Sequence, residues 1–257
     1  MEILGIIQSE LEKVEQRHGV RILHAVESGS RSWGFASPDS DYDVRFVYVR
    51  PAADYLRLDE PRDMINWKLD EVLDINGWDL RKAMKLFARG NASLFEWSYS
   101  PIIYRTTDEW NRVRETAKAY FSEKTAVCHY YGTAMSTYSN YLTEESVRYK
   151  KYFYALRPLL AARWIEQTHQ IPPVLFDDLL TMDLDPELRA AIQYLLERKK
   201  VTTEKEGNPQ IPAIRSFIRD ELQRQKAIGN ALPEDRNPDF APLNRCFLQI
   251  IGLDSIA

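Results

Sequence analysis

One stretch, residues 23–50, constrains the fold and the chemistry of this chain more than any other. Two apolar runs, residues 20–27 and 42–49, are rich in Val, Ile, Phe and Tyr and are bounded by Gly, Ser and Pro, so both are predicted strands. Between them lie a Gly-Ser pair, an aromatic-glycine turn and an Asp-Tyr-Asp sequence. We expect the chemistry of the protein to lie in this loop.

The paired acids of this loop indicate a cation site. Asp41 and Asp43 are two positions apart at the start of the second strand, so the strand period turns both carboxylates to one face. Neighbouring carboxylates repel each other unless a cation lies between them. Hard cations such as Mg²⁺ are usually held by one or two carboxylates and by substrate phosphates. The pair therefore predicts Mg²⁺, or Mn²⁺, together with a nucleoside triphosphate.

The Gly-Ser pair is suited to hold those phosphates. Gly29 permits a positive φ or a close approach of the backbone to a ligand, and Ser30 offers a hydroxyl and, at a helix start, a free N–H for an anion. The alternative is a solvated loop, because Gly, Ser and Asp are common in turns. The combination of strand, Gly-Ser, a gap of ten residues, Asp-x-Asp and strand favours the functional interpretation.

A third carboxylate is expected from the predicted strand at residues 72–78. Asp74, Asn76 and Trp78 share one face of that strand. Asp79 directly precedes the helical pattern of residues 80–89, and an Asp in that position is commonly an N-cap. Both acids remain candidates, and we prefer Asp74 because it lies within the strand.

The pattern of Gly-Ser followed by Asp-x-Asp resembles the DNA polymerase β-like nucleotidyltransferase superfamily, and more closely a bacterial branch of predicted nucleotidyltransferases associated with RNA repair. The resemblance implies that Gly29 and Ser30 bind nucleotide phosphates and that Asp41, Asp43 and Asp74 are catalytic and bind the metal.

A second segment supports the same resemblance. Residues 73–97 are similar to the strand-then-helix segment of that branch, which usually ends in Gly-Asn-Pro, although Ala92 stands here where Pro is common. The resemblance implies an enzyme that moves a nucleoside monophosphate from an NTP, such as ATP, to a hydroxyl group. An RNA end is the acceptor that the branch suggests.

Composition limits the other functions open to the chain. The 257 residues carry a net charge of −4, so any attraction to nucleic acid must come from a local basic patch. The two cysteines show no CxxC spacing, which argues against a zinc site and suits a reducing cytosol. No apolar run approaches ~18 residues and no signal peptide is evident, so we expect a cytoplasmic protein without a membrane partner.

The distribution of elements predicts an α+β fold: a small mixed β-sheet nucleotidyltransferase core with flanking helices, followed by an all-helical C-terminal domain. The expected catalytic domain spans residues 1–120, and the expected helical domain, residues 121–257, closes the active-site cleft. Helices are predicted in the second part at residues 122–142, 145–167, 173–182, 186–200, 212–228 and 242–251.

The helical part contains one candidate for nucleotide contact. Lys150, Tyr154 and Arg157 fall at i, i+4 and i+7 on a predicted helix and could offer two cations and a ring to a triphosphate and a base. A solvated charged face is the alternative.

Three functions therefore stay open. The first is nucleotidyl transfer to an RNA end. The second is transfer to a protein or to a small molecule such as an aminoglycoside, because fold and motif do not choose the acceptor. The third is a nucleotide-binding protein without turnover, which an intact set of acids disfavours.

Overall fold

The computed structural model describes residues 3–37, 40–201 and 207–253. Contacts between backbone positions divide the chain into two compact units. The first runs to Phe121 and resumes at Arg236, and the second comprises Ser122–Asp235. The first break lies close to the expected residue 120. The C-terminal segment, which we expected in the helical domain, instead belongs to the first unit.

A five-stranded mixed sheet in the order β3-β4-β2-β1-β5 forms the centre of the first unit. Strands β2 and β4 are parallel, and the other neighbours are antiparallel. The α+β class with a small mixed sheet is therefore confirmed. The strands are β1 (Arg21–Ser28), β2 (Tyr42–Val49), β3 (Met64–Leu69), β4 (Leu73–Asp79) and β5 (Ile103–Thr106).

One face of this sheet packs against α1 (Ile3–His18). The predicted apolar stripe of α1 supplies Ile7, Leu11 and Val14, which are all fully buried. Alternate residues of the strands complete this core, as the period of two in a strand requires. They include Ile22, Val44, Phe46, Tyr48, Leu73 and Ile75.

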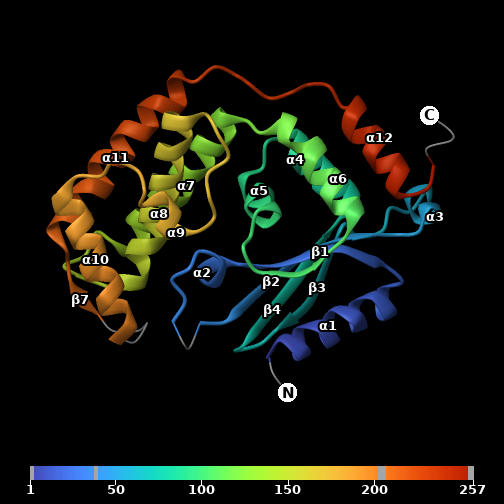
Figure 1. Cartoon of the computed structure of the whole chain (residues 1–257), viewed down its shortest axis with the longest axis horizontal. Coiled ribbons are helices and arrows are strands. Elements are labelled where there is room, and N and C mark those ends of the chain that lie inside the picture. Colours follow the sequence, from blue (N-terminus) through green and yellow to red (C-terminus); the bar gives the residue numbers. More distant parts are fainter. Residues whose placement is uncertain (1–2, 38–39, 202–206, 254–257) are drawn as a thin grey trace. The chain divides into compact units, whose positions relative to one another are not determined.

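The opposite face carries α4 (Leu80–Ala88), α5 (Ala92–Ser98) and α6 (Asp108–Ala117), and α12 (Ala241–Ile250) packs on α4 and α6 (Figure 1). Local sequence sets the starts of these helices. Asp79 caps α4 through Arg81 N–H, Asn91 caps α5 and Thr107 caps α6. The short helices of this unit are α2 (Gly29–Ser32), α3 (Ala52–Tyr55) and the 3₁₀ turn Lys118–Tyr120.

The second unit is helical, as predicted, but contains one small addition. Two-residue strands β6 (Ser146–Val147) and β7 (Asn208–Pro209) pair antiparallel, so this part is not wholly helical. Its helices are α7 (Glu123–Tyr141), α8 (Tyr149–Thr168), α9 (Phe176–Leu179), α10 (Pro186–Val201) and α11 (Pro212–Ala231).

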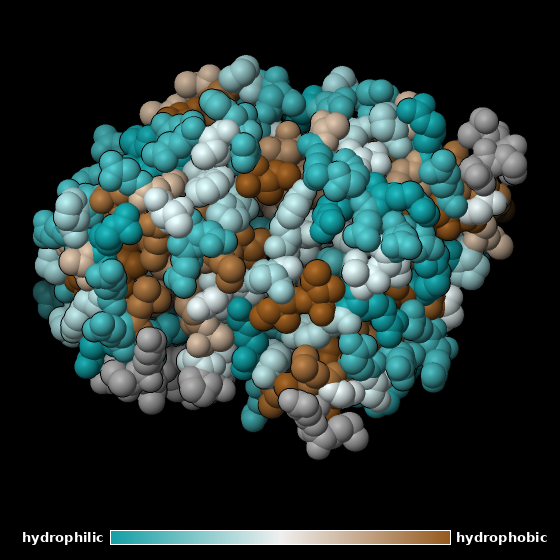
Figure 2. All heavy atoms as spheres, viewed as in Figure 1, coloured by the Kyte–Doolittle hydropathy of each residue, from teal (hydrophilic) through white to brown (hydrophobic). Residues whose placement is uncertain are grey.

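No helix in the described part of the chain is long and apolar enough to cross a bilayer. On the visible face, hydrophilic residues are spread widely and apolar residues form separate patches (Figure 2).

Candidate active site

The Gly-Ser turn lies against the acidic strand. Strand β1 ends at Ser28, and Gly29 opens the single turn α2 with a φ of +64°, a conformation that favours glycine. A Cβ atom at this position would lie 2.3 Å from Oδ2 of Asp43. Two features therefore favour glycine at position 29: the positive φ and the close approach of the Asp43 side chain. Ser30 follows it and is buried.

Arg31 holds the loop that carries the first acid. Its Nε donates to the backbone oxygen of Asp41 at 3.0 Å, and its Nη2 donates to that of Ser40. The guanidinium also lies 3.7 Å from the centroid of the Tyr42 ring. These contacts join the Gly-Ser turn to the Asp-x-Asp segment and fix the entry to β2.

Asp43 and Asp74 form the centre of the site. They are register partners on the parallel strands β2 and β4. Nη2 of Arg45 contacts Oδ1 of Asp43 at 2.8 Å and Oδ2 of Asp74 at 2.6 Å. Nη1 of Arg45 donates to the backbone oxygen of Asp74 at 2.8 Å. Two carboxylates from neighbouring strands thus converge on one positively charged nitrogen atom.

The donor set fits a hard divalent cation. Paired carboxylate oxygens around one point are ligands that Mg²⁺ takes, and substrate phosphates commonly supply the others. Asp41 lies directly before β2 with an exposed side chain that has no hydrogen bond or ion pair to another described residue. Among the described residues, no three His, Cys, Asp or Glu side chains are grouped as a metal site. The structure therefore pairs Asp43 with Asp74 and does not group Asp41 with them.

A buried acid accepts a hydrogen bond from the backbone of Asp43. The Glu27 carboxylate, fully buried at the end of β1, accepts hydrogen bonds from Asp43 N–H at 2.8 Å and from the Tyr104 hydroxyl. Burial raises the pKa of Glu27. Our sequence analysis did not identify Glu27, Arg45 or Tyr104. The available signal was an acid or a base within an otherwise apolar strand, where an ionisable residue needs a partner.

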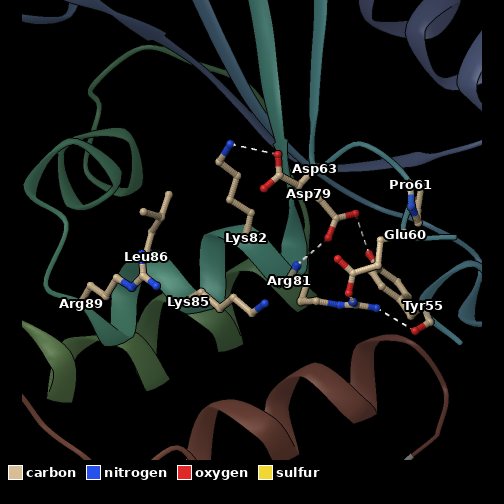
Figure 3. Close-up of a pocket in the computed structure, with 10 residues that line it drawn as sticks. All are labelled: Tyr55, Glu60, Pro61, Asp63, Asp79, Arg81, Lys82, Lys85, Leu86 and Arg89. Carbon is tan, nitrogen blue, oxygen red and sulfur yellow. Dashed lines mark hydrogen bonds and ion pairs between the residues drawn. The ribbon is translucent and has the colours of Figure 1, made fainter. Parts of the chain in front are cut away.

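Asp79, the rival third acid, has a different environment. It lies five positions after Asp74, at the opposite end of β4, where it caps α4 and accepts a hydrogen bond from the Tyr55 hydroxyl at 3.0 Å. Burial raises its pKa. Asp79 lines a separate pocket between α4 and residues 55–63 (Figure 3). The predicted N-cap is confirmed, and this position favours Asp74 as the partner of Asp43.

The candidate nucleotide contacts of the second unit differ from one another. Lys150 and Tyr154 are half-exposed on α8, with Nζ of Lys150 5.9 Å from the centroid of the Tyr154 ring. Arg157 is only 1% exposed, and its Nε donates to the backbone oxygen of Val174 at 3.2 Å. The expectation of one accessible stripe is therefore wrong for Arg157, because the helix turns that position into the interior of its unit.

A mixed sheet that presents a Gly-Ser turn beside paired aspartates is the arrangement of polymerase β-like nucleotidyltransferases. Residues 4–249 match the family described as RlaP, the RNA repair pathway DNA polymerase beta family, and the chain belongs to this family. It is 40% identical over 250 residues to the uncharacterized protein YcgL of Bacillus subtilis (strain 168), with 95% of each chain covered.

A solved structure, that of a nucleotidyltransferase-like protein from Exiguobacterium sibiricum, aligns over 95% of this chain and 79% of that chain. The sequence identity is 10% and the TM-score is 0.31.

Proposed function

We propose that the protein is a metal-dependent nucleotidyltransferase that moves a nucleoside monophosphate from an NTP, such as ATP, to a hydroxyl group of an RNA end. One observation supports this proposal most strongly: Asp43 and Asp74 converge on one cationic nitrogen atom while Asp43 lies against the Gly29 turn. Family membership supports the reaction class.

Each residue has a distinct role in the proposed reaction. Asp43 and Asp74, together with Asp41, would hold Mg²⁺ or Mn²⁺. When bound, the cation neutralises the charge that develops on the phosphates. Gly29 and Ser30 hold the departing phosphates through backbone N–H groups and the Ser30 hydroxyl.

The acceptor reacts in line with the departing group. Its hydroxyl oxygen forms a bond to the α-phosphorus, and the bond from that phosphorus to pyrophosphate breaks. Asp74, which is still partly exposed, takes the hydroxyl proton and passes it to solvent. Lys150 and Tyr154 are proposed as additional nucleotide contacts, and the buried Arg157 is not included.

Transfer of label tests this function directly. The protein is incubated with Mg²⁺, each NTP labelled at the α-phosphate, and RNA, protein or aminoglycoside acceptors in parallel. Label on RNA that disappears in Asp43→Asn supports the proposal. Label on protein or aminoglycoside instead would favour the second function. Undiminished transfer by a folded Asp43→Asn variant would reject the mechanism, and NTP binding without transfer to any acceptor would favour the third.

A further inference from the structure

The pocket at the far end of β4 contains cations that the proposed reaction does not use. Its volume is about 290 Å³, and four basic side chains from α4 and the residue that follows it line the pocket together with Tyr55 and acids of residues 60–79 (Figure 3). The four are Arg81, Lys82, Lys85 and Arg89.

Two of these cations are already paired and two are available to a ligand. Arg81 donates to the backbone oxygen of Tyr55 at 2.8 Å, and Nζ of Lys82 lies 3.1 Å from Oδ1 of Asp63. The side chains of Lys85 and Arg89 are exposed, and neither forms an ion pair or a hydrogen bond with another described residue. Four residues of helix separate them by a rise of about 6 Å, which is similar to the spacing of successive phosphates in an extended strand.

A row of partly exposed side chains leads from the acid pair toward this pocket. Asp74, Asn76 and Trp78 alternate on one face of β4, and each keeps some exposure. Nζ of Lys82 lies 5.6 Å from the centroid of the Trp78 ring, where the row meets α4. Trp97 packs on the Trp78 ring with the two centroids 4.1 Å apart, so a base can contact only the remaining surface of the indole. Nδ2 of Asn76 donates to Oδ1 of Asp74 at 3.3 Å, and the amide oxygen of Asn76 can accept a hydrogen bond from a base. The length of this row, from Asp74 to Asp79 at the N-cap of α4, is about 17 Å.

We infer that this pocket binds the phosphate backbone of a single-stranded RNA acceptor, a few nucleotides away from the end that reacts. The inference deepens the proposed function and rests on it for the position of the reacting end. A chain with a net charge of −4 has no general attraction for RNA, so local cations must supply it. Lys85 and Arg89 contact phosphates, and Trp78 contacts a base between them and Asp74.

Binding of fluorescent RNA without NTP tests the inference independently of transfer. Wild type is compared with Lys85→Ala/Arg89→Ala over a range of salt concentrations, with an RNA of about twelve nucleotides and with a dinucleotide. A matched control, Lys13→Ala/Arg17→Ala, removes one Lys and one Arg at the same i, i+4 spacing from α1, which packs on the other face of the sheet.

We expect the pocket variant to bind the longer RNA roughly tenfold more weakly and its salt slope to fall by about 1.4, since each contact to single-stranded nucleic acid contributes about 0.7. The control and the dinucleotide, which is too short to reach the pocket, should show no such loss. Unchanged binding of the longer RNA, or an equal loss in the control, overturns the inference. Loss of ATP binding with RNA binding retained also overturns it, because the pocket would then hold a free nucleotide.

If RNA binding depends on the pocket but no NTP yields transfer, the proposed function fails and the pocket assignment stands. If label is transferred to RNA but wild type, the pocket variant and the control bind RNA with equal affinity, the proposed function stands and the pocket assignment fails.

Discussion

Arg45 supplies the positive charge between Asp43 and Asp74, so its removal should destabilise the metal-free protein. Substitution of Arg45 by Met keeps the apolar stem and removes the charge. The two carboxylates, which both lie within 3 Å of Nη2, would then face each other without a counter-charge. We therefore expect Arg45→Met to be less stable than wild type in EDTA, and to recover when Mg²⁺ is added.

The magnitude follows from distance and exposure. Two like charges about 4 Å apart repel by about 4 kcal/mol at an effective dielectric constant of about 20, which is a ceiling for this site. The side chains of Arg45, Asp43 and Asp74 are 15%, 24% and 27% exposed, so solvent screens part of this energy. We expect a loss of about 2 kcal/mol, equivalent to roughly 6 °C in the melting temperature of a chain of this size.

Thermal unfolding in EDTA and in millimolar Mg²⁺ measures both effects. Mg²⁺ should stabilise Arg45→Met more than wild type, because the cation binds the folded carboxylates and need not compete with the guanidinium. Arg21→Met is the control. It breaks the exposed pair with Glu109, which is 3.1 Å long, and should cost less than about 1 kcal/mol with or without Mg²⁺.

A double variant separates repulsion from lost packing. Arg45→Met/Asp74→Asn removes one of the two like charges and should regain most of the lost stability in EDTA. Equal stability of Arg45→Met and wild type in EDTA, or equal stabilisation of both by Mg²⁺, would refute the reasoning.

Three further predictions concern the same unit. Gly29→Ala should lose roughly 2 kcal/mol of stability and most transfer activity. Gly19 is the control, because its φ of +60° is similar but an added Cβ would meet no atom within 4 Å. Gly19→Ala should therefore show only the backbone strain and keep its activity. Asp74→Asn should abolish label transfer, whereas Asp79→Asn should retain it because Asn is also a good N-cap. The reverse result would make Asp79 the third acid. Burial lowers the pKa of His24 to about 4, so an unfolded chain binds the proton more readily between that pH and about 6.5. Stability should therefore fall by up to about 1.4 kcal/mol per pH unit as acid is added across this window, and His24→Gln should remove this component in denaturant titrations.

Much of the first unit could be predicted from local sequence. Apolar runs rich in β-branched and aromatic residues defined β1 and β2, and capping residues such as Asp79 and Thr107 defined helix starts. These signals depend on neighbours in the chain, so they can be read without a fold. The placement of α12 could not be predicted this way, because the apolar stripe of a helix does not indicate which unit the helix packs against.

The candidate site shows the same division. Sequence spacing identified Gly29, Ser30, Asp41, Asp43 and Asp74 as candidates. It could not show that Arg45 would join two of the acids, because that contact depends on the register between strands separated by a long connection. It also misjudged Arg157, whose helical spacing was correct but whose face of α8 is buried.

The sequence by itself determined the local conformations and the kinds of side chain available for chemistry, since propensity, capping and strand period act over a few residues. Only the tertiary structure decided which of those side chains meet. The parallel pairing of β2 with β4 brings Asp43 opposite Asp74 and leaves Asp79 at the other end of the strand, and a shift of one residue in that register would turn one acid to the opposite face.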